Sequence, residues 1–267
     1  MSISRNNMPI GFFDSGVGGL TVLKEVKKLM PNESFIYFGD TLHVPYGEKT
    51  KEQLLDYSKD ILNFFHERKC KAVVMACNTT SSTIYEDIKN KYYFKIYPIV
   101  QTIAKVLAKT SLQRLGIFAT PATINSGAYE QEIRKYNSNM EIFGQHCPDW
   151  VKIVENNTSQ NAESIEIIKN DLNIMLRNNP QKIVLGCTHY PFLTNAISEV
   201  LPGIKLIDIG VALSEAIRHN LQICHEQNEN RVEYCFSDRE TTFKRFDAEH
   251  LKSLPKGEIY AVNIERF

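Results

Sequence analysis

Short apolar runs alternate with segments in which apolar residues recur every three or four positions along most of the chain. Runs such as residues 72–76 and 182–186, bounded by polar residues, are typical of strands buried on both faces of a parallel sheet. Residues 54–65 instead have the spacing of an amphipathic helix. The alternation of the two patterns predicts βαβ crossovers and an α/β fold with mainly parallel sheets. We expect strands at 9–13, 34–38, 72–76, 114–119, 140–144, 182–186 and 205–209, and helices at 20–30, 54–65, 80–91, 122–136, 162–177 and 212–221.

The order of these elements indicates a coarse internal duplication. Each half of the chain opens with a strand that ends in a small polar turn, at Asp14 in the first half and at Thr120 in the second. Each half later reaches a strand that ends in cysteine, at Cys77 (63 residues after Asp14) and at Cys187 (67 residues after Thr120). The similar spacing predicts two similar α/β domains related by pseudo-twofold symmetry.

The domain boundaries follow from this duplication. We expect the first domain to comprise residues 1–97 plus 209–267 and the second to comprise residues 98–208. The polar stretch 227–230 indicates a loop before a short final section, which we expect to pack back on the first domain. Ligands of open α/β sheets bind at the carboxyl ends of the strands, so the functional site is expected in the cleft between the domains.

Charge and hydropathy narrow the choice of partners. The 31 basic and 31 acidic residues leave a formal net charge of zero, whereas nucleic acids and anionic membranes attract clustered positive charge. No apolar run approaches the roughly 20 residues of a transmembrane helix. Residues 1–7 lead into a strand without the apolar segment of a signal peptide. We therefore expect a cytoplasmic protein with a small-molecule substrate and with no nucleic-acid or membrane partner.

The six cysteines are expected to be free thiols, because the chain shows no signal peptide and no dense cysteine framework. The sequence contains no Cys-x-x-Cys spacing, which argues against a structural metal. A zinc site could recruit Cys77, Cys187 and His189, with Cys147 or Asp14 in addition. Nothing in the spacing enforces such tetrahedral ligation, so no metal is expected.

The two cysteine strands share one motif, in which an apolar run is followed by cysteine and small polar residues. Asn78-Thr79 follows Cys77, and Thr188-His189 follows Cys187. A thiol near a helix N-terminus and polar donors forms a thiolate more readily than a buried one. The matched motifs predict two reactive thiols that face each other across a cleft. The other cysteines are expected to be small buried side chains: Cys70, Cys147, Cys224 and Cys235.

A glycine-rich segment, residues 13–19, lies between a predicted strand and a predicted helix. Thr21 stands where a dinucleotide-binding fingerprint needs its last glycine, and no Lys-Ser/Thr pair completes a Walker A loop. Two interpretations remain. The turn could bind a substrate carboxylate through backbone N–H groups, or it could be a structural turn capped by Asp14 or Ser15. The turn at 44–47 is a candidate wall of the same cleft.

Four sequence blocks together resemble glutamate racemases of the aspartate/glutamate racemase family. They are Phe-Asp-Ser-Gly-Val-Gly-Gly-Leu-Thr-Val at 13–22, Val-Pro-Tyr-Gly at 44–47, Ala-Cys-Asn-Thr at 76–79 and Gly-Cys-Thr-His-Tyr-Pro at 186–191. Their order and spacing match those of the family over nearly the whole chain. The resemblance implies interconversion of L- and D-glutamate without a cofactor, which supplies D-glutamate for peptidoglycan. It also implies a homodimer whose active sites lie between two α/β domains.

The resemblance implies roles for individual residues as well. Cys77 would handle the proton on the D-glutamate side and Cys187 the proton on the L-glutamate side, with Asp14 and His189 assisting them. Glu155 matches an acidic residue that lines the family's cleft. The implied substrate contacts are Asp14, Ser15, Tyr46, Gly47, Asn78, Thr79, Thr120, Thr123, Thr188 and His189.

Two alternatives stay open at this stage. Aspartate racemases share the paired cysteines but lack the Asp-Ser-Gly-Val-Gly-Gly block and the histidine after Cys-Thr. A two-domain protein that binds an acidic amino acid without turning it over is the alternative from another class. The chain departs from the family pattern at Asp149–Lys152 and at Ile209. These departures affect the expected oligomer contacts, regulation and cleft shape, but not the expected chemistry.

Overall fold

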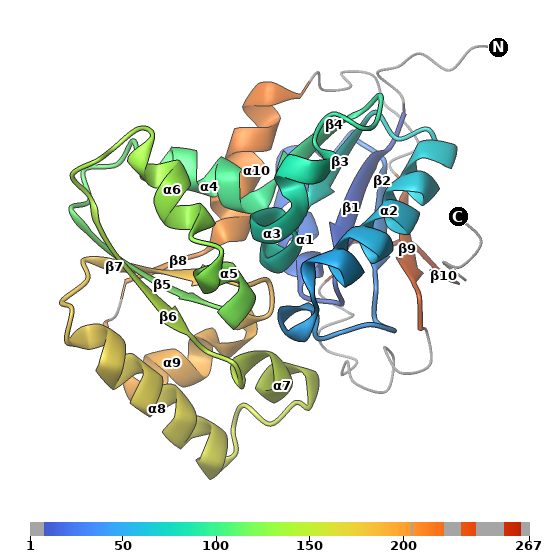
Figure 1. Ribbon diagram of the computed structural model, residues 1–267. Coiled ribbons are helices and arrows are strands. Elements are labelled where there is room, and N and C mark those ends of the chain that lie inside the picture. Colours follow the sequence, from blue (N-terminus) through green and yellow to red (C-terminus); the bar gives the residue numbers. More distant parts are fainter. Residues whose placement is uncertain (1–7, 204, 222–230, 239–253, 263–267) are drawn as a thin grey trace.

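Two parallel sheets flanked by helices organise this computed structural model, which describes residues 8–203, 205–221, 231–238 and 254–262 (Figure 1). The strand pairs of both sheets are parallel, which confirms the α/β class. The first sheet has the order β10-β9-β2-β1-β3-β4, with β1 (Ile10–Asp14), β2 (Phe35–Gly39), β3 (Ala72–Met75), β4 (Lys95–Pro98), β9 (Val232–Phe236) and β10 (Glu258–Ala261). The second has the order β6-β5-β7-β8, with β5 (Arg114–Ala119), β6 (Glu141–His146), β7 (Lys182–Gly186) and β8 (Leu206–Ile207).

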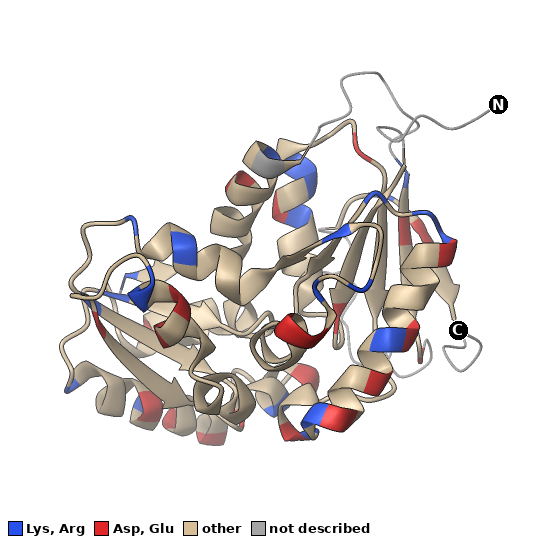
Figure 2. Ribbon diagram, turned by 45° about the horizontal axis from the view of Figure 1, so that its top comes forward, with Lys and Arg blue, Asp and Glu red and all other residues tan. Residues whose placement is uncertain are grey.

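Helices connect the strands and cover the sheets. In chain order the α-helices are α1 (Gly19–Leu29), α2 (Lys51–Glu67), α3 (Asn78–Ile88), α4 (Ile99–Leu107), α5 (Pro121–Asn125), α6 (Ala128–Arg134), α7 (Trp150–Glu155), α8 (Ala162–Leu176), α9 (Thr194–Val200) and α10 (Ile209–Asn220). Short 3-10 helices occur at η2 (Tyr46–Glu48) and η3 (Tyr190–Leu193). Figure 2 shows acidic and basic residues side by side on the outer helices, in keeping with the balanced charge of the chain.

The internal duplication predicted from spacing is present in the topology. The order β2-β1-β3-β4 in the first sheet corresponds to β6-β5-β7-β8 in the second. Asp14 and Thr120 therefore lie at equivalent ends, of β1 and β5, and Cys77 and Cys187 follow the equivalent strands β3 and β7. Because the carboxyl ends of parallel strands share one edge of a sheet, each half brings its first turn and its cysteine to the same edge.

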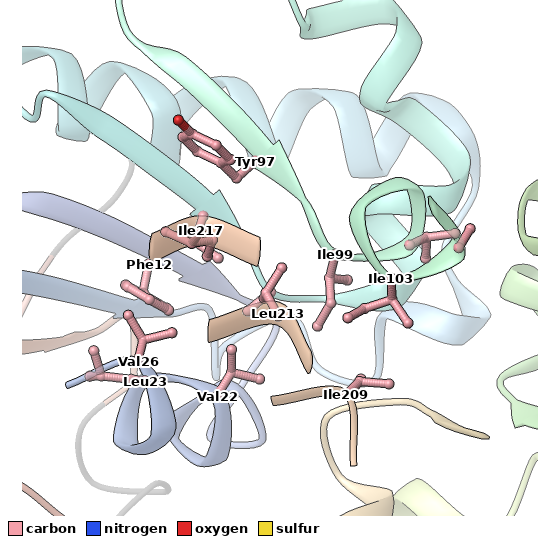
Figure 3. Packing of buried hydrophobic residues seen from close by; sticks show 14 of the residues in the cluster. Phe12, Val22, Leu23, Val26, Tyr97, Ile99, Ile103, Ile209, Leu213 and Ile217 are labelled. Carbon is pink, nitrogen blue, oxygen red and sulfur yellow. The ribbon is translucent and has the colours of Figure 1, made fainter. Parts of the chain in front are cut away.

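The largest core cluster packs α1, α4 and α10 against the first sheet. Val22, Leu23 and Val26 of α1 lie near Leu213 of α10, and all four are fully buried (Figure 3). The apolar residues whose spacing predicted α1 thus form the face that this helix buries. A Leu213→Ala change in such a setting typically costs about 2–5 kcal/mol of stability. Since α10 contacts α1, α4 and also β7, it links the two halves of the molecule.

The final section of the chain returns to the first sheet. Strand β9 pairs in parallel with β2, from Val232 beside Phe35 to Phe236 beside Gly39, and β10 pairs with β9. This confirms the expectation that the final section packs back on the first half. The domain boundaries themselves, 1–97 plus 209–267 and 98–208, stay a prediction. Cys224 lies outside the described residues.

Two predicted elements were wrong in extent. The helix expected over 122–136 is two helices, α5 and α6, separated at Gly127, whose φ of 65° is a left-handed conformation that glycine adopts without steric cost. The strand expected to reach residue 209 ends at Ile207. There the Asp208 side chain accepts a hydrogen bond from the Gly210 N–H, 2.7 Å away, and starts α10. Among the described residues, no helix is long and apolar enough to cross a membrane.

Candidate active site

Cys77 and Cys187 line one pocket from opposite halves of the molecule. Cys77 is the N-cap residue of α3 and is 4% exposed, and Cys187 directly follows β7 and is 6% exposed. The thiols predicted to share a cleft are therefore brought together. The pocket is lined by Ser15, Val44, Pro45, Tyr46, Gly47, Glu48, Cys77, Asn78, Thr79, Thr120, Pro121, Pro148, Val151, Cys187, Thr188 and His189.

The Cys77 sulfur is buried and lies near a carboxylate. Burial and the neighbouring carboxylate of Asp14 raise the pKa of Cys77 to about 12, and hydrogen bonding by Thr80 and Ser15 opposes them only in part. Both main effects disfavour the thiolate: burial removes water that would solvate its charge, and the Asp14 carboxylate repels it. In the unliganded protein the Cys77 side chain is accordingly a neutral thiol near neutral pH, so its place at the N-terminus of α3 does not lower its pKa as the sequence predicted.

Asp14 is fully buried and saturated with hydrogen-bond donors. Its Oδ2 accepts hydrogen bonds from the backbone N–H groups of Gly16 (3.1 Å) and Gly19 (3.0 Å). Its Oδ1 accepts one from the hydroxyl of Thr188 (3.2 Å), which belongs to the opposite half. The hydrogen bonds of these two amides agree with the second interpretation of the glycine-rich segment, a structural turn capped by Asp14. They bind the protein's own carboxylate, which in turn holds the two halves together beside Cys77.

Glycines of this segment and of the turn at 44–47 permit the close approach of the halves. A Cβ atom at Gly18 would lie 2.5 Å from Thr188 Oγ1 and 2.8 Å from His189 Nδ1. At Gly47, in the turn at 44–47, a Cβ atom would lie 3.2 Å from the Cβ of Thr120. Each glycine therefore leaves room for a residue of the opposite half. This confirms the turn at 44–47 as a wall of the cleft.

The Cys187 sulfur faces an imidazole. His189 Nδ1 lies 3.9 Å from Cys187 Sγ, and His189 Nε2 lies 2.7 Å from Glu155 Oε1. Burial lowers the pKa of His189, but hydrogen bonding and charge interactions with Cys187 and Glu155 outweigh burial and leave that pKa well above its usual value. The ring lies between a carboxylate and a sulfur, an arrangement that favours its protonated form. An anionic sulfur at Cys187 would face this cation.

Hydroxyl and amide groups line the space between the sulfurs. Thr79 Oγ1 and Thr120 Oγ1 are 3.0 Å apart across the cleft, and Thr120 donates a hydrogen bond to Thr123 (3.0 Å). The hydroxyl of Tyr129 donates to Asn78 Oδ1 (2.8 Å). This bond fixes the amide, whose buried Nδ2 has no hydrogen-bond partner among the described residues. An orphaned donor in the wall of a pocket suits an anionic or carbonyl group of a ligand.

Tyr46 contributes its ring to the pocket, while its hydroxyl donates a hydrogen bond to Asp40. Asp40 is fully buried and also contacts His43 Nδ1 (2.8 Å) and the Ser237 hydroxyl (2.7 Å). Sequence reasoning missed Asp40 and His43. The only available signal was their position after the strand that ends at Gly39, at the edge where the other site residues gather.

Ten of the residues predicted for the site line the pocket directly. Asp14, Thr123 and Glu155 lie behind its wall, where they contact Thr188, Thr120 and His189 respectively. The roles implied for all these residues stay predictions. Six lining residues were not among the predicted contacts: Val44, Pro45, Glu48, Pro121, Pro148 and Val151. Within the described part of the chain, no group of three or more His, Cys, Asp and Glu side chains is arranged to hold a metal ion.

Fold and site together describe an α/β protein in which two thiols line one pocket from opposite halves. The family model of Asp/Glu/hydantoin racemases matches residues 20–217. Glutamate racemase 2 of Caldanaerobacter subterraneus subsp. tengcongensis is 35% identical over 98% of this chain and 100% of its own.

Two solved structures extend the likeness to the whole fold. The glutamate racemase of Francisella tularensis in complex with D-glutamate has a TM-score of 0.85 and 28% identity, covering 98% of this chain and 100% of its own. The glutamate racemase of Thermus thermophilus in complex with β-chloro-D-alanine has a TM-score of 0.83 and 32% identity, covering 98% and 99%. The chain belongs to the Asp/Glu/hydantoin racemase family.

Proposed function

We propose that the protein interconverts L- and D-glutamate by a two-base mechanism in which Cys77 and Cys187 act on opposite faces of the substrate. The observation that carries the proposal is the pair of sulfurs at equivalent strand ends lining one pocket from opposite halves. The relatives named as glutamate racemases support the choice of substrate. The solved structure of the Francisella tularensis glutamate racemase contains D-glutamate.

The chemistry explains why two thiols are needed. Inversion at Cα requires removal of a proton from one face and delivery of a proton to the other, and two fixed acid–base groups achieve this without turning the substrate over. An amino-acid α-proton is far less acidic than a thiol, whose unperturbed pKa is about 8.5. The site must therefore also stabilise the charge that develops on the carboxylate. The Asn78 amide, whose Nδ2 has no hydrogen-bond partner among the described residues, is a preorganised donor for that purpose.

The unlike surroundings of the sulfurs favour one resting state. Cys77 is held as a neutral thiol by burial and Asp14, whereas an imidazolium lies beside Cys187. This arrangement suits Cys77 as the group that delivers a proton and leaves Cys187 as the group that removes one. With Cys187 on the L-glutamate side, as the family resemblance implies, this resting state accepts L-glutamate first. Binding of D-glutamate requires the opposite protonation pattern.

The remaining expectations belong to the same proposal. Supply of D-glutamate for peptidoglycan, a homodimeric assembly and a cytoplasmic location stay predictions. The two-domain division at residues 97/98 and 208/209 also stays a prediction. It is supported by the separate sheets and by the equivalent strand orders of the two halves.

Incubation of the purified protein with L-glutamate in D2O tests the proposal. We expect D-glutamate to accumulate, which chiral chromatography measures. We also expect deuterium to enter Cα, which proton NMR measures. Prior dialysis against a chelator, with no pyridoxal phosphate added, should leave the rate unchanged. Parallel incubation with L-aspartate separates the two amino-acid substrates. Saturable glutamate binding without deuterium incorporation would instead identify a non-catalytic binding protein.

A further inference from the structure

The single tryptophan of the chain lies behind the Cys187 side of the cleft. Trp150 is the first residue of α7 and is fully buried. Its ring packs against Phe118 of β5, with ring centroids 4.8 Å apart, and against Tyr190, with centroids 4.9 Å apart. Tyr190 directly follows His189 in the chain. The indole therefore contacts the short segment that carries the imidazole.

Trp150 is connected to Glu155 as well, because Glu155 is the last residue of the same helix. The helix is only six residues long, so fewer than two helical turns separate Trp150 from Glu155. Glu155 must keep its Oε1 within hydrogen-bonding distance of His189 Nε2, now 2.7 Å. The indole thus supports both members of the Glu155–His189 pair, one through α7 and the other through Tyr190.

Asp171 anchors the indole through a hydrogen bond. This residue of α8 accepts a hydrogen bond from Trp150 Nε1 at 2.7 Å. Gln145 of β6 braces Asp171, because its side-chain amide donates to Asp171 Oδ1 (3.2 Å) and to the Asp171 carbonyl oxygen (2.9 Å). A hydrogen bond to an ionised acceptor is shorter and roughly twice as strong as a neutral one.

We propose that Asp171 is a positioning residue for the Cys187 half of the reaction, because its hydrogen bond to Trp150 fixes the helix and the tyrosine that bring Glu155 and His189 together. The inference rests on the proposed function and deepens it. Its effect is one-sided, since the imidazole contacts Cys187 while Cys77 is surrounded by Asp14, Ser15 and Thr80.

Overall racemisation cannot reveal a one-sided effect. The enantiomers have equal free energy in water, so kcat/KM must be equal in the two directions, and a defect on either face lowers both. A β-chlorinated glutamate separates the faces. Removal of its α-proton by a single base expels chloride, and the resulting enamine hydrolyses to 2-oxoglutarate and ammonia. The L-enantiomer reports on Cys187 and the D-enantiomer on Cys77.

The decisive variant is Asp171→Leu, which removes the acceptor. We expect elimination from the L-enantiomer to slow by about ten- to a hundred-fold, as misplacement of a catalytic group does, with elimination from the D-enantiomer unchanged. Asp171→Asn keeps an oxygen acceptor for the indole N–H and should restore the L-reaction. Glu166→Gln is the matched control, because Glu166 lies on the same helix and is 62% exposed. If Asp171→Leu does not fold, Trp150→Phe, which removes the donor, replaces it in the elimination assay.

Fluorescence supplies a readout that does not depend on turnover. Because the chain has one tryptophan, its emission reports on Trp150 alone. Asp171→Leu should shift the emission maximum, whereas Asp171→Asn and Glu166→Gln should keep it. An equal loss with both enantiomers, or a shifted emission with unchanged elimination, would overturn the inference. A wild-type protein that incorporates no deuterium into glutamate would overturn the proposed function instead, while the emission shift would still report the hydrogen bond.

Discussion

Cys77 and Cys187 occupy equivalent positions in two similar sheets, yet their surroundings differ in charge. Cys77 lies beside the buried carboxylate of Asp14, and Cys187 lies beside the imidazolium of His189. A duplicated scaffold therefore places the two sulfurs symmetrically, while the residues around each sulfur differ in charge. The comparison suggests that one thiol is kept as the acid and the other is prepared as the base.

The largest effect is expected from removing either sulfur. Cys77→Ser and Cys187→Ser should each lower kcat for glutamate racemisation by about three orders of magnitude or more, because a serine hydroxyl is a far weaker base at neutral pH. Initial rates by circular dichroism measure the loss. Cys235→Ala is the matched control: it should keep wild-type kcat, although loss of a buried side chain can cost about 1–3 kcal/mol of stability. Near-normal racemisation by either serine variant would contradict the two-base account.

A smaller effect is expected when the cation beside Cys187 is removed. His189→Asn should lower kcat by roughly a hundred-fold, the scale of one assisting acid–base group. With a β-chlorinated glutamate the loss should fall on the L-enantiomer, because His189 contacts Cys187. Glu155→Gln keeps the hydrogen-bond acceptor and should have a weaker effect of the same kind. Equal losses with both enantiomers would show that His189 serves the whole cleft rather than one sulfur.

The Cys77 side can be tested through the pH dependence of stability. The pKa of Cys77 is raised to about 12 in the folded protein, whereas an unfolded thiol ionises at about 8.5. Folding stability from this group is full below the unfolded pKa and is lost as pH rises towards the folded pKa. One such group contributes a slope of about 1.4 kcal/mol per pH unit in that window.

Urea unfolding at several pH values between about 8.5 and 10 measures this slope. Buried Cys70 and Cys235, whose pKa values are also raised, to about 12 and about 11, contribute to it. Cys77→Ser should therefore make the slope shallower without abolishing it. An identical slope in wild type and Cys77→Ser would show that Cys77 ionises as readily in the folded protein as in the unfolded chain.

The smallest effect is expected at the mouth of the cleft. Lys152 of α7 lies 3.0 Å from Glu48 of η2, and this ion pair joins the two halves beside the pocket. Both side chains are more than half exposed, so the pair is screened by water and salt. Lys152→Met should change KM for glutamate by less than about three-fold, and high salt should remove the difference. A ten-fold change in kcat would show that the pair does more than close the entrance.

The sequence was sufficient to predict what depends on local pattern. The apolar runs at 72–76 and 182–186 placed both cysteines at strand ends, and the similar spacing of the halves predicted their equivalent positions. The break at Gly127 and the early start of α10 at Ile209, capped by Asp208, were missed. Each depends on one residue's backbone or capping geometry, which a periodic pattern does not contain.

Contacts across the fold were beyond prediction from pattern alone. The Glu155–His189 pair joins residues 34 positions apart, and the Thr188–Asp14 bond joins residues 174 positions apart. The sequence left open whether the turn at Gly18 binds a ligand or is structural, and in the structure this glycine permits the close approach of Thr188 and His189. Such features depend on contacts between residues far apart in the chain, so sequence spacing carries little information about them.

The most direct test of the account is elimination from the two enantiomers of a β-chlorinated glutamate by the two serine variants. Each variant retains one thiol, and elimination needs only one base. We predict that Cys77→Ser releases ammonia from the L-enantiomer alone and Cys187→Ser from the D-enantiomer alone. If both variants process the same enantiomer, the sulfurs do not serve opposite faces and the two-base mechanism is wrong for this protein.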